Sequence, residues 1–214
     1  MEQKIQEAIK NAIEGAPERK FVESLDMAFT IKDVDLKTPN NRIQEEIRLP
    51  AGRGKQIKIA MFAASDAAKK AKDAGIHVID PSEIEELGKN KGKAKKIANS
   101  FDFFLSEVPH MGLIGRYLGV VLGPRGKMPR PVPPVVDRAA IAAGLQSTTV
   151  VKSRDKVTFQ TSFGTLAQSE DELLKNAMEV YTRVTSRLER GVGNIRSLNI
   201  KTTMGPATRV EVVN

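Results

Sequence analysis

The chain has 214 residues, 40% of them hydrophobic, which is enough for one or two packed cores. Lys and Arg outnumber Asp and Glu by 34 to 26, and the net charge of +8 favours a polyanionic partner. The absence of Cys excludes disulfides and thiolate metal sites, and no stretch approaches the roughly 18 apolar residues of a membrane-spanning helix. Since the charged N-terminus also lacks the apolar core of a signal peptide, the cytoplasm is the expected location.

The first part of the chain predicts one helix and then strands. Ile5, Ile9 and Ile13 recur at helical spacing, and the Gly-Ala-Pro run at 15–17 ends the pattern. Apolar residues then alternate with polar or small ones at 27–32, and a similar pattern returns at 43–49. These segments are expected to be strands with one buried face.

The middle of the chain has a different rhythm. Short apolar runs alternate with helical segments, which predicts a parallel three-layer α/β unit. The apolar runs lie at 57–62, 76–79 and 101–108, and the helical segments lie at 65–74, from 80 onward, at 111–122 and at 135–143.

The last part of the chain returns to strands around one long helix. Ser169 and Glu172 form a capping box at the start of this helix, whose apolar stripe runs from Leu173 to Leu188. The expected strands are 149–153, 157–163, 196–203 and 208–213.

The two ends of the chain are each too small to bury a good core alone. We therefore expect one discontinuous α+β domain, formed by 1–52 and 152–214, with an inserted parallel α/β domain at 53–151. The fold class is α/β with two domains.

The sequence offers little for catalysis. It has two histidines, of which His77 is expected in the core and His110 at a helix start, and it has no cluster at metal spacing. No glycine-rich dinucleotide fingerprint follows the first strand of the α/β unit. We expect no catalytic residue, metal or cofactor.

Three segments could contact nucleic acid, and each has a plainer interpretation. The lysines of 89–96 suit phosphate contact or a solvated helix end. The segment 115–131 combines glycines four residues apart, which could admit a close neighbour, with cations on a proline-stiffened loop. The segment 201–206 offers hydroxyls, Met204 and a Gly-Pro turn, which suit ribose contact or an ordinary β-turn.

Four motifs stand out along the chain: KFVES at 20–24, LPAGRGK at 49–55, GRYLGVVLGPRGKMP at 115–129 and TTMGP at 202–206. Together they resemble the ribosomal protein L-one family, the proteins of the mobile stalk on the large ribosomal subunit. They occur in the family's order and span essentially the whole chain. The segment after the third motif departs from the Asn-Pro-Lys that is frequent in the family, and the short N-terminus resembles archaeal members.

The resemblance implies a Rossmann-like topology for the inserted domain and an RNA site on the discontinuous one. A buried core position is the alternative for Phe21, the one aromatic residue of that site. The implied RNA-binding residues are Lys20, Phe21, Ser24, Asp155, Lys156, Ser197, Thr203, Met204 and Gly205. A secondary contact, or a purely structural loop, is implied for Arg116, Arg125, Lys127 and Arg130.

The resemblance also implies a function without catalysis. The chain would bind large-subunit ribosomal RNA, form the mobile stalk near the exit site and assist release of deacylated tRNA. It would repress translation of its own mRNA by binding a similar element, and it would be a cytoplasmic protein, monomeric off the ribosome and without membrane contact. Two rival classes remain, an enzyme that uses the α/β unit and a general basic scaffold for nucleic acids.

Overall fold

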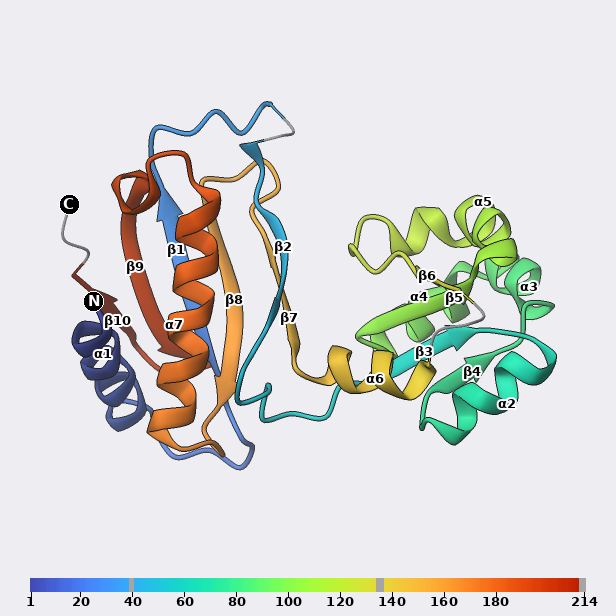
Figure 1. The fold of residues 1–214 in the computed structure, drawn as a ribbon, viewed down its shortest axis with the longest axis horizontal. Helices are drawn as coiled ribbons and strands as arrows, with labels where there is room; N and C mark the ends of the chain where they lie inside the picture. The colour runs from blue at the N-terminus through green and yellow to red at the C-terminus, as the bar shows by residue number, and fades with distance from the viewer. Residues whose placement is uncertain (39–40, 134–136, 212–214) are drawn as a thin grey trace. The chain divides into compact units, whose positions relative to one another are not determined.

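The computed structural model describes residues 1–38, 41–133 and 137–211. The chain forms two compact units, one from Met1–Lys55 with Ser147–Asn214 and one from Gln56–Gln146 (Figure 1). The observed boundaries differ from those estimated at 52 and 152. The reason is that β7 (Thr148–Lys152) pairs antiparallel with β2 (Gln44–Arg48) of the first unit, so the whole of β7 belongs there.

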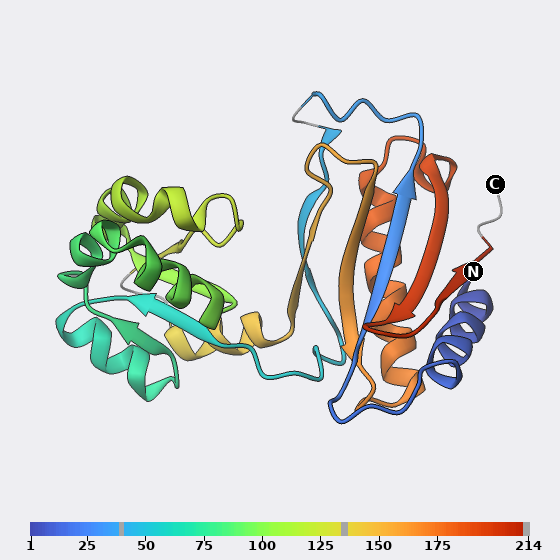
Figure 2. The ribbon, with the colours of Figure 1, turned by 180° about the vertical axis from the view of Figure 1, so that it is seen from behind.

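The first unit is built on a four-stranded antiparallel sheet with the order β10-β9-β1-β8. Two helices, α1 (Glu2–Glu14) and α7 (Glu170–Arg187), pack on one face, and none of the helices described for this unit lies on the other face (Figures 1 and 2). The strands are β1 (Ser24–Ile31), β8 (Thr158–Thr165), β9 (Ile195–Thr202) and β10 (Ala207–Val210).

The alternation expected in β1 is confirmed. Leu25, Met27, Phe29 and Ile31 are buried under the helices, and the residues between them are half-buried on the opposite face. Phe29 stacks on Phe159 of β8 at 5.4 Å between ring centroids. The pattern follows from the pleat, which sends successive side chains to opposite faces of a sheet.

Helix α7 begins as its sequence predicts. The Ser169 hydroxyl accepts from the Glu172 amide, and the Glu172 carboxylate accepts from the Ser169 amide. A residue in the middle of α7, Asn176, also binds the segment through which the chain leaves the first unit, at Ala51 and Gly52. Asn176 accepts from the Ala51 amide through Oδ1 at 3.0 Å and donates through Nδ2 to the carbonyl of Gly52 at 2.8 Å.

The second unit is a parallel sheet with the order β4-β3-β5-β6, as the strand–helix rhythm predicts. Alternate residues of β3 face two separate cores, so the sheet is covered on both sides. Part of the helix expected at 135–143 and of the strand expected at 208–213 lies outside the described residues. The elements are β3 (Ile59–Phe62), α2 (Ser65–Asp73), β4 (His77–Ile79), α3 (Glu83–Lys89), α4 (Lys91–Ser100), β5 (Phe103–Glu107), α5 (Met111–Leu122), β6 (Arg130–Val132) and α6 (Arg138–Gln146).

Candidate nucleic-acid interface

The sheet face opposite α1 and α7, which we call the open face, carries polar side chains at most of its positions. Figure 2 shows the strands from this side, with α7 behind them. Strand register places Ala28 between Asn199 and Gln160, and Thr30 between Ser197 and Thr158. Most side chains here are uncharged donors or acceptors. The open face comprises Ser24, Asp26, Ala28, Thr30, Thr158, Gln160, Ser162, Ser197, Asn199, Lys201, Ala207 and Arg209.

One end of the open face is a tightly bonded turn that joins two of the sequence motifs. The amide of Thr203 donates to the carbonyl of Ser24 at 3.0 Å, and the amide of Met204 donates to Oε2 of Glu23 at 2.8 Å. The amide of Gly205 donates to the hydroxyl of Thr202 at 3.0 Å. All three amides of the turn are therefore satisfied within the protein.

The same turn uses the hydroxyl of Thr203. It accepts from the Ser24 amide at 3.2 Å and lies 3.3 Å from the Ser24 carbonyl, to which it donates. Gly205 has a steric role as well, because a Cβ atom there would lie 2.3 Å from the Thr202 hydroxyl oxygen. Thr203 and Gly205 thus shape the turn.

The turn presents apolar side chains to solvent. Phe21 is 54% exposed and Met204 is 58% exposed, which excludes the core position considered for Phe21. Lys20, next to Phe21, is also exposed. Exposed large apolar side chains beside a polar surface are typical of an interaction site.

The remaining residues of the expected site lie toward the other end of the sheet. Ser197 faces Thr30, and Asp155 and Lys156 are exposed in the turn that leads into β8. From Ser24 to Thr30 the strand rises about 20 Å at roughly 3.3 Å per residue. The expected residues therefore do not form one cluster but mark the two ends of the open face.

The charge of the open face is nearly balanced. Asp26 lies between Lys201 and Ser162 in the register. Burial raises the pKa of Asp26, although the positive charges of Lys201 and Arg53 act in the opposite direction. Such a surface suits contacts to hydroxyls and base edges more than a broad contact to phosphates.

Sequence reasoning missed several of these residues. Asp26, Asn199 and Lys201 were not among the expected site residues, although they occupy the same alternate positions as Ser24 and Ser197. The signal was available, because polar residues alternate with buried ones along β1 and β9.

The four cations of α5, of the loop after it and of β6 make contacts within the second unit. The ammonium of Lys127 donates to the carbonyls of Ala98 and Phe101 at 3.0 and 2.7 Å, at the end of α4. Arg125 donates to the carbonyl of Val121 at 2.9 Å. The guanidinium carbon of Arg130 lies 4.8 Å from the ring centroid of Phe103, and Arg116 lies 5.7 Å from that of Tyr117.

Two other expectations for the second unit need correction or refinement. A Cβ atom at Gly115 or Gly119 would meet nothing within 4 Å, so these glycines do not admit a close neighbour within the protein. Within the cluster at 89–96, the ammonium of Lys93 is paired with Glu86 at 2.9 Å.

Among the described residues, the two histidines do not lie in a group that could act as a catalytic or metal centre. His77 is exposed and stacks on Phe101 at 4.9 Å, contrary to the core position expected for it. His110 lies 3.6 Å from Glu107. Among the described residues, no group of three or more His, Cys, Asp or Glu could hold a metal ion.

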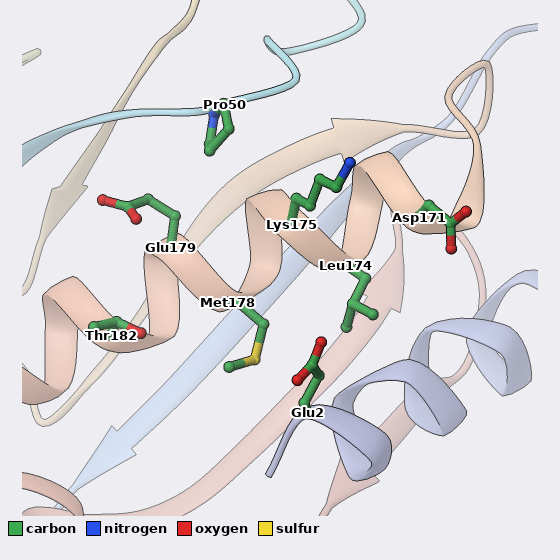
Figure 3. A pocket seen from close by; sticks show the side chains of 8 residues that line it. All are labelled: Glu2, Pro50, Asp171, Leu174, Lys175, Met178, Glu179 and Thr182. Carbon is green, nitrogen blue, oxygen red and sulfur yellow. The ribbon is translucent and has the colours of Figure 1, made fainter.

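A pocket of about 560 Å³ lies on the outer face of α7, where Leu174 and Met178 point toward Glu2 (Figure 3). The three carboxylates that line it stabilise the helices or form an ion pair. Asp171 lies in the first turn of α7, Glu2 lies in that of α1, and Glu179 is paired with Arg183 at 2.8 Å. In the described part of the chain, no helix is long and apolar enough to span a membrane.

Comparison with known proteins gives a consistent result. Residues 7–206 match the model of the Ribosomal protein L1p/L10e family. The chain is 45% identical over 208 residues to the large ribosomal subunit protein uL1 of Archaeoglobus fulgidus, with 97% of each chain covered. It is 43% identical over 205 residues to that of Methanocella arvoryzae, covering 95% of this chain and 96% of the relative.

The fold and these matches define a structural protein of the ribosome rather than an enzyme. The chain belongs to the Ribosomal protein L1p/L10e family. Its nearly full-length similarity to archaeal relatives agrees with the archaeal character of its motifs.

Proposed function

We propose that this chain is part of the large ribosomal subunit and binds large-subunit ribosomal RNA through the open face and the turn at 203–205. One observation carries the proposal. Two motifs about 180 positions apart are bonded together at one end of the open face, and they carry the exposed side chains of Phe21 and Met204. Similarity to large-subunit proteins supports the choice of RNA.

The composition of the face suggests how the RNA is recognised. Hydroxyls and amides can bond to 2′-hydroxyls and to base edges, and the two exposed apolar side chains can pack against a base or a sugar. With Lys201 and Arg209 as the cations of the open face, recognition depends on the shape of an irregular stem more than on charge.

The first test is a salt titration of binding to two RNAs. One is the irregular stem of large-subunit ribosomal RNA that the chain is proposed to bind, which we call the ribosomal stem, and the other is a scrambled duplex. Six or more phosphate contacts would cost roughly a thousandfold in affinity between 50 and 200 mM salt, and we expect a clearly shallower dependence for the stem. Replacing Lys89, Lys91 and Lys95 by Gln should slow association and lower binding to the scrambled duplex, while the specific complex persists. A steep dependence shared by both RNAs and lost in this variant would identify a general basic scaffold instead.

A second test uses the first unit alone, with residues 56–146 replaced by a short Gly-rich linker. The open face and the turn lie entirely in the remaining unit. We expect this variant to retain the affinity of the full chain for the stem. Loss of affinity in a variant that circular dichroism shows to be folded would refute the placement of the site.

We further propose that the bound chain forms the mobile stalk near the exit site and assists release of deacylated tRNA. The same surface would bind a similar stem in the chain's own mRNA and repress its translation, and the free protein would be a monomer. Competition between the ribosomal stem and the mRNA leader tests repression, because one shared surface requires mutual exclusion. Simultaneous binding of both RNAs to one chain would contradict it.

A further inference from the structure

The buried carboxylate of Glu23 has no evident role in the core. Its residue is 1% exposed, and it follows the exposed segment of Phe21 and Val22. Oε2 accepts from the amide of Met204 at 2.8 Å, and Oε1 is buried without a hydrogen-bond partner among the residues that the structure describes. A buried carboxylate is costly unless its hydrogen bonds compensate it. Among the described residues, the carboxyl group of Glu23 makes one hydrogen bond, which it accepts from the Met204 amide in the turn.

The bond of Glu23 completes the connection between the two motifs. The next residue, Ser24, is joined to Thr203 through both its amide and its carbonyl. Glu23 adds the adjacent contact one residue further along the turn, and its own carbonyl accepts from the amide of Leu166 at 3.0 Å. The turn is therefore held by Glu23 and Ser24, and Glu23 is itself held by the residue that follows β8.

The contact also relates two exposed side chains. Phe21 lies two residues before Glu23, and Met204 carries the amide that Glu23 accepts from. This hydrogen bond restricts the main chain of Met204 relative to the segment of Phe21 before any partner arrives. Such preorganisation lowers the entropic cost of binding.

We propose that Glu23 is the positioning residue of the RNA interface, which fixes the Met204 main chain relative to Phe21 without touching the RNA itself. This inference rests on the proposed RNA-binding function. Glu23 would thus affect RNA affinity although it is buried and is not one of the exposed residues that would contact the RNA.

The test separates the reach of the side chain from the presence of a carboxyl group. Glu23→Gln retains an oxygen at the same distance along the side chain, so it can still accept from the Met204 amide. Glu23→Asp retains the carboxyl group but is one methylene shorter, so it loses the 2.8 Å contact. The matched controls are Glu18→Gln and Glu18→Asp, at an exposed carboxylate of the same segment.

Affinity for the ribosomal stem is measured at a temperature at which circular dichroism shows the variant folded, together with amide hydrogen exchange at Met204. We expect Glu23→Asp to bind about ten- to a hundredfold more weakly, mainly through faster dissociation, and to exchange the Met204 amide faster. We expect Glu23→Gln to stay within about threefold of the wild type in affinity, even though its Nε2 lacks a partner and lowers the unfolding midpoint.

A merely structural residue would give a different pattern, in which stability falls and affinity does not. Wild-type affinity in folded Glu23→Asp, or an equal loss in Glu23→Gln, would overturn the proposal. If Glu23→Asp does not fold, Glu23→Gln decides the question. A loss of affinity in Glu23→Gln would refute the role of side-chain reach. Wild-type affinity in Glu23→Gln, together with a Met204 amide that stays protected from exchange, would support that role. Failure of the wild type itself to bind the stem would refute the proposed function instead.

Discussion

Asn176 is the buried polar side chain whose removal should damage the first unit most clearly. It is fully buried in α7, and its amide bonds to three main-chain groups from two other segments. Oδ1 accepts from the Ala51 amide at 3.0 Å, and Nδ2 donates to the carbonyls of Gly52 at 2.8 Å and Phe163 at 2.9 Å. The substitution Asn176→Ala removes all three bonds.

The magnitude follows from the surroundings of these groups. A buried polar group without a partner costs about 1–3 kcal/mol. Phe163 is fully buried, so its carbonyl should incur most of this cost, whereas Ala51 and Gly52 are half-buried and water can partly replace Asn176 there. Adding the small cavity, we expect a loss of about 3 kcal/mol, which corresponds to a fall of roughly 10 °C in the unfolding midpoint.

The assay is thermal unfolding followed by circular dichroism, with amide exchange at Ala51 as a local probe. Asn11→Ala, at an exposed position of α1, is the matched control and should change stability by less than about 0.5 kcal/mol. Asn176→Asp keeps the shape but loses both donated bonds, so it should destabilise the unit at least as much. A fall of less than about 1 kcal/mol for Asn176→Ala would show that the amide does not hold the segment at Ala51 and Gly52 as its geometry indicates.

Three further predictions follow. Because burial raises the pKa of Asp26, the folded chain binds its proton at higher pH than the unfolded chain does, so ionised Asp26 lowers stability. Asp26→Asn should therefore raise the unfolding midpoint at pH 7. This increase should shrink as the pH falls toward 3.8, the ordinary pKa of an aspartate, and an increase that stays constant would contradict this cause. Lys127→Met should destabilise the second unit by about 1–3 kcal/mol in thermal unfolding, because the carbonyls of Ala98 and Phe101 lose their donor, while an equal loss of affinity for the ribosomal stem would argue against a structural role. Gly205→Ala should weaken binding of the stem by about tenfold, since its Cβ atom would displace the Thr202 hydroxyl, and unchanged affinity in a gel-shift titration would show that the shape of the turn is unimportant.

Local patterns in the sequence determined the elements and the class of fold. Alternation from Met27 to Ile31 identified the buried face of β1, and the capping box at Ser169 located the start of α7. The strand–helix rhythm of the middle segment identified the parallel unit. These features could be predicted because burial has the period of the local backbone, about 2 residues in a strand and 3.6 in a helix.

The tertiary structure alone decided which distant groups meet. No local pattern indicates that Glu23 accepts from Met204, or that Ser24 is bonded to Thr203 across 179 positions. The same limit applies to Lys127, for which the sequence left open a secondary RNA contact and a structural loop, and whose ammonium bonds to carbonyls at the end of α4. Periodicity reports whether a side chain is buried, whereas the choice of its partner depends on strand order and packing, which are settled only when the whole chain has folded.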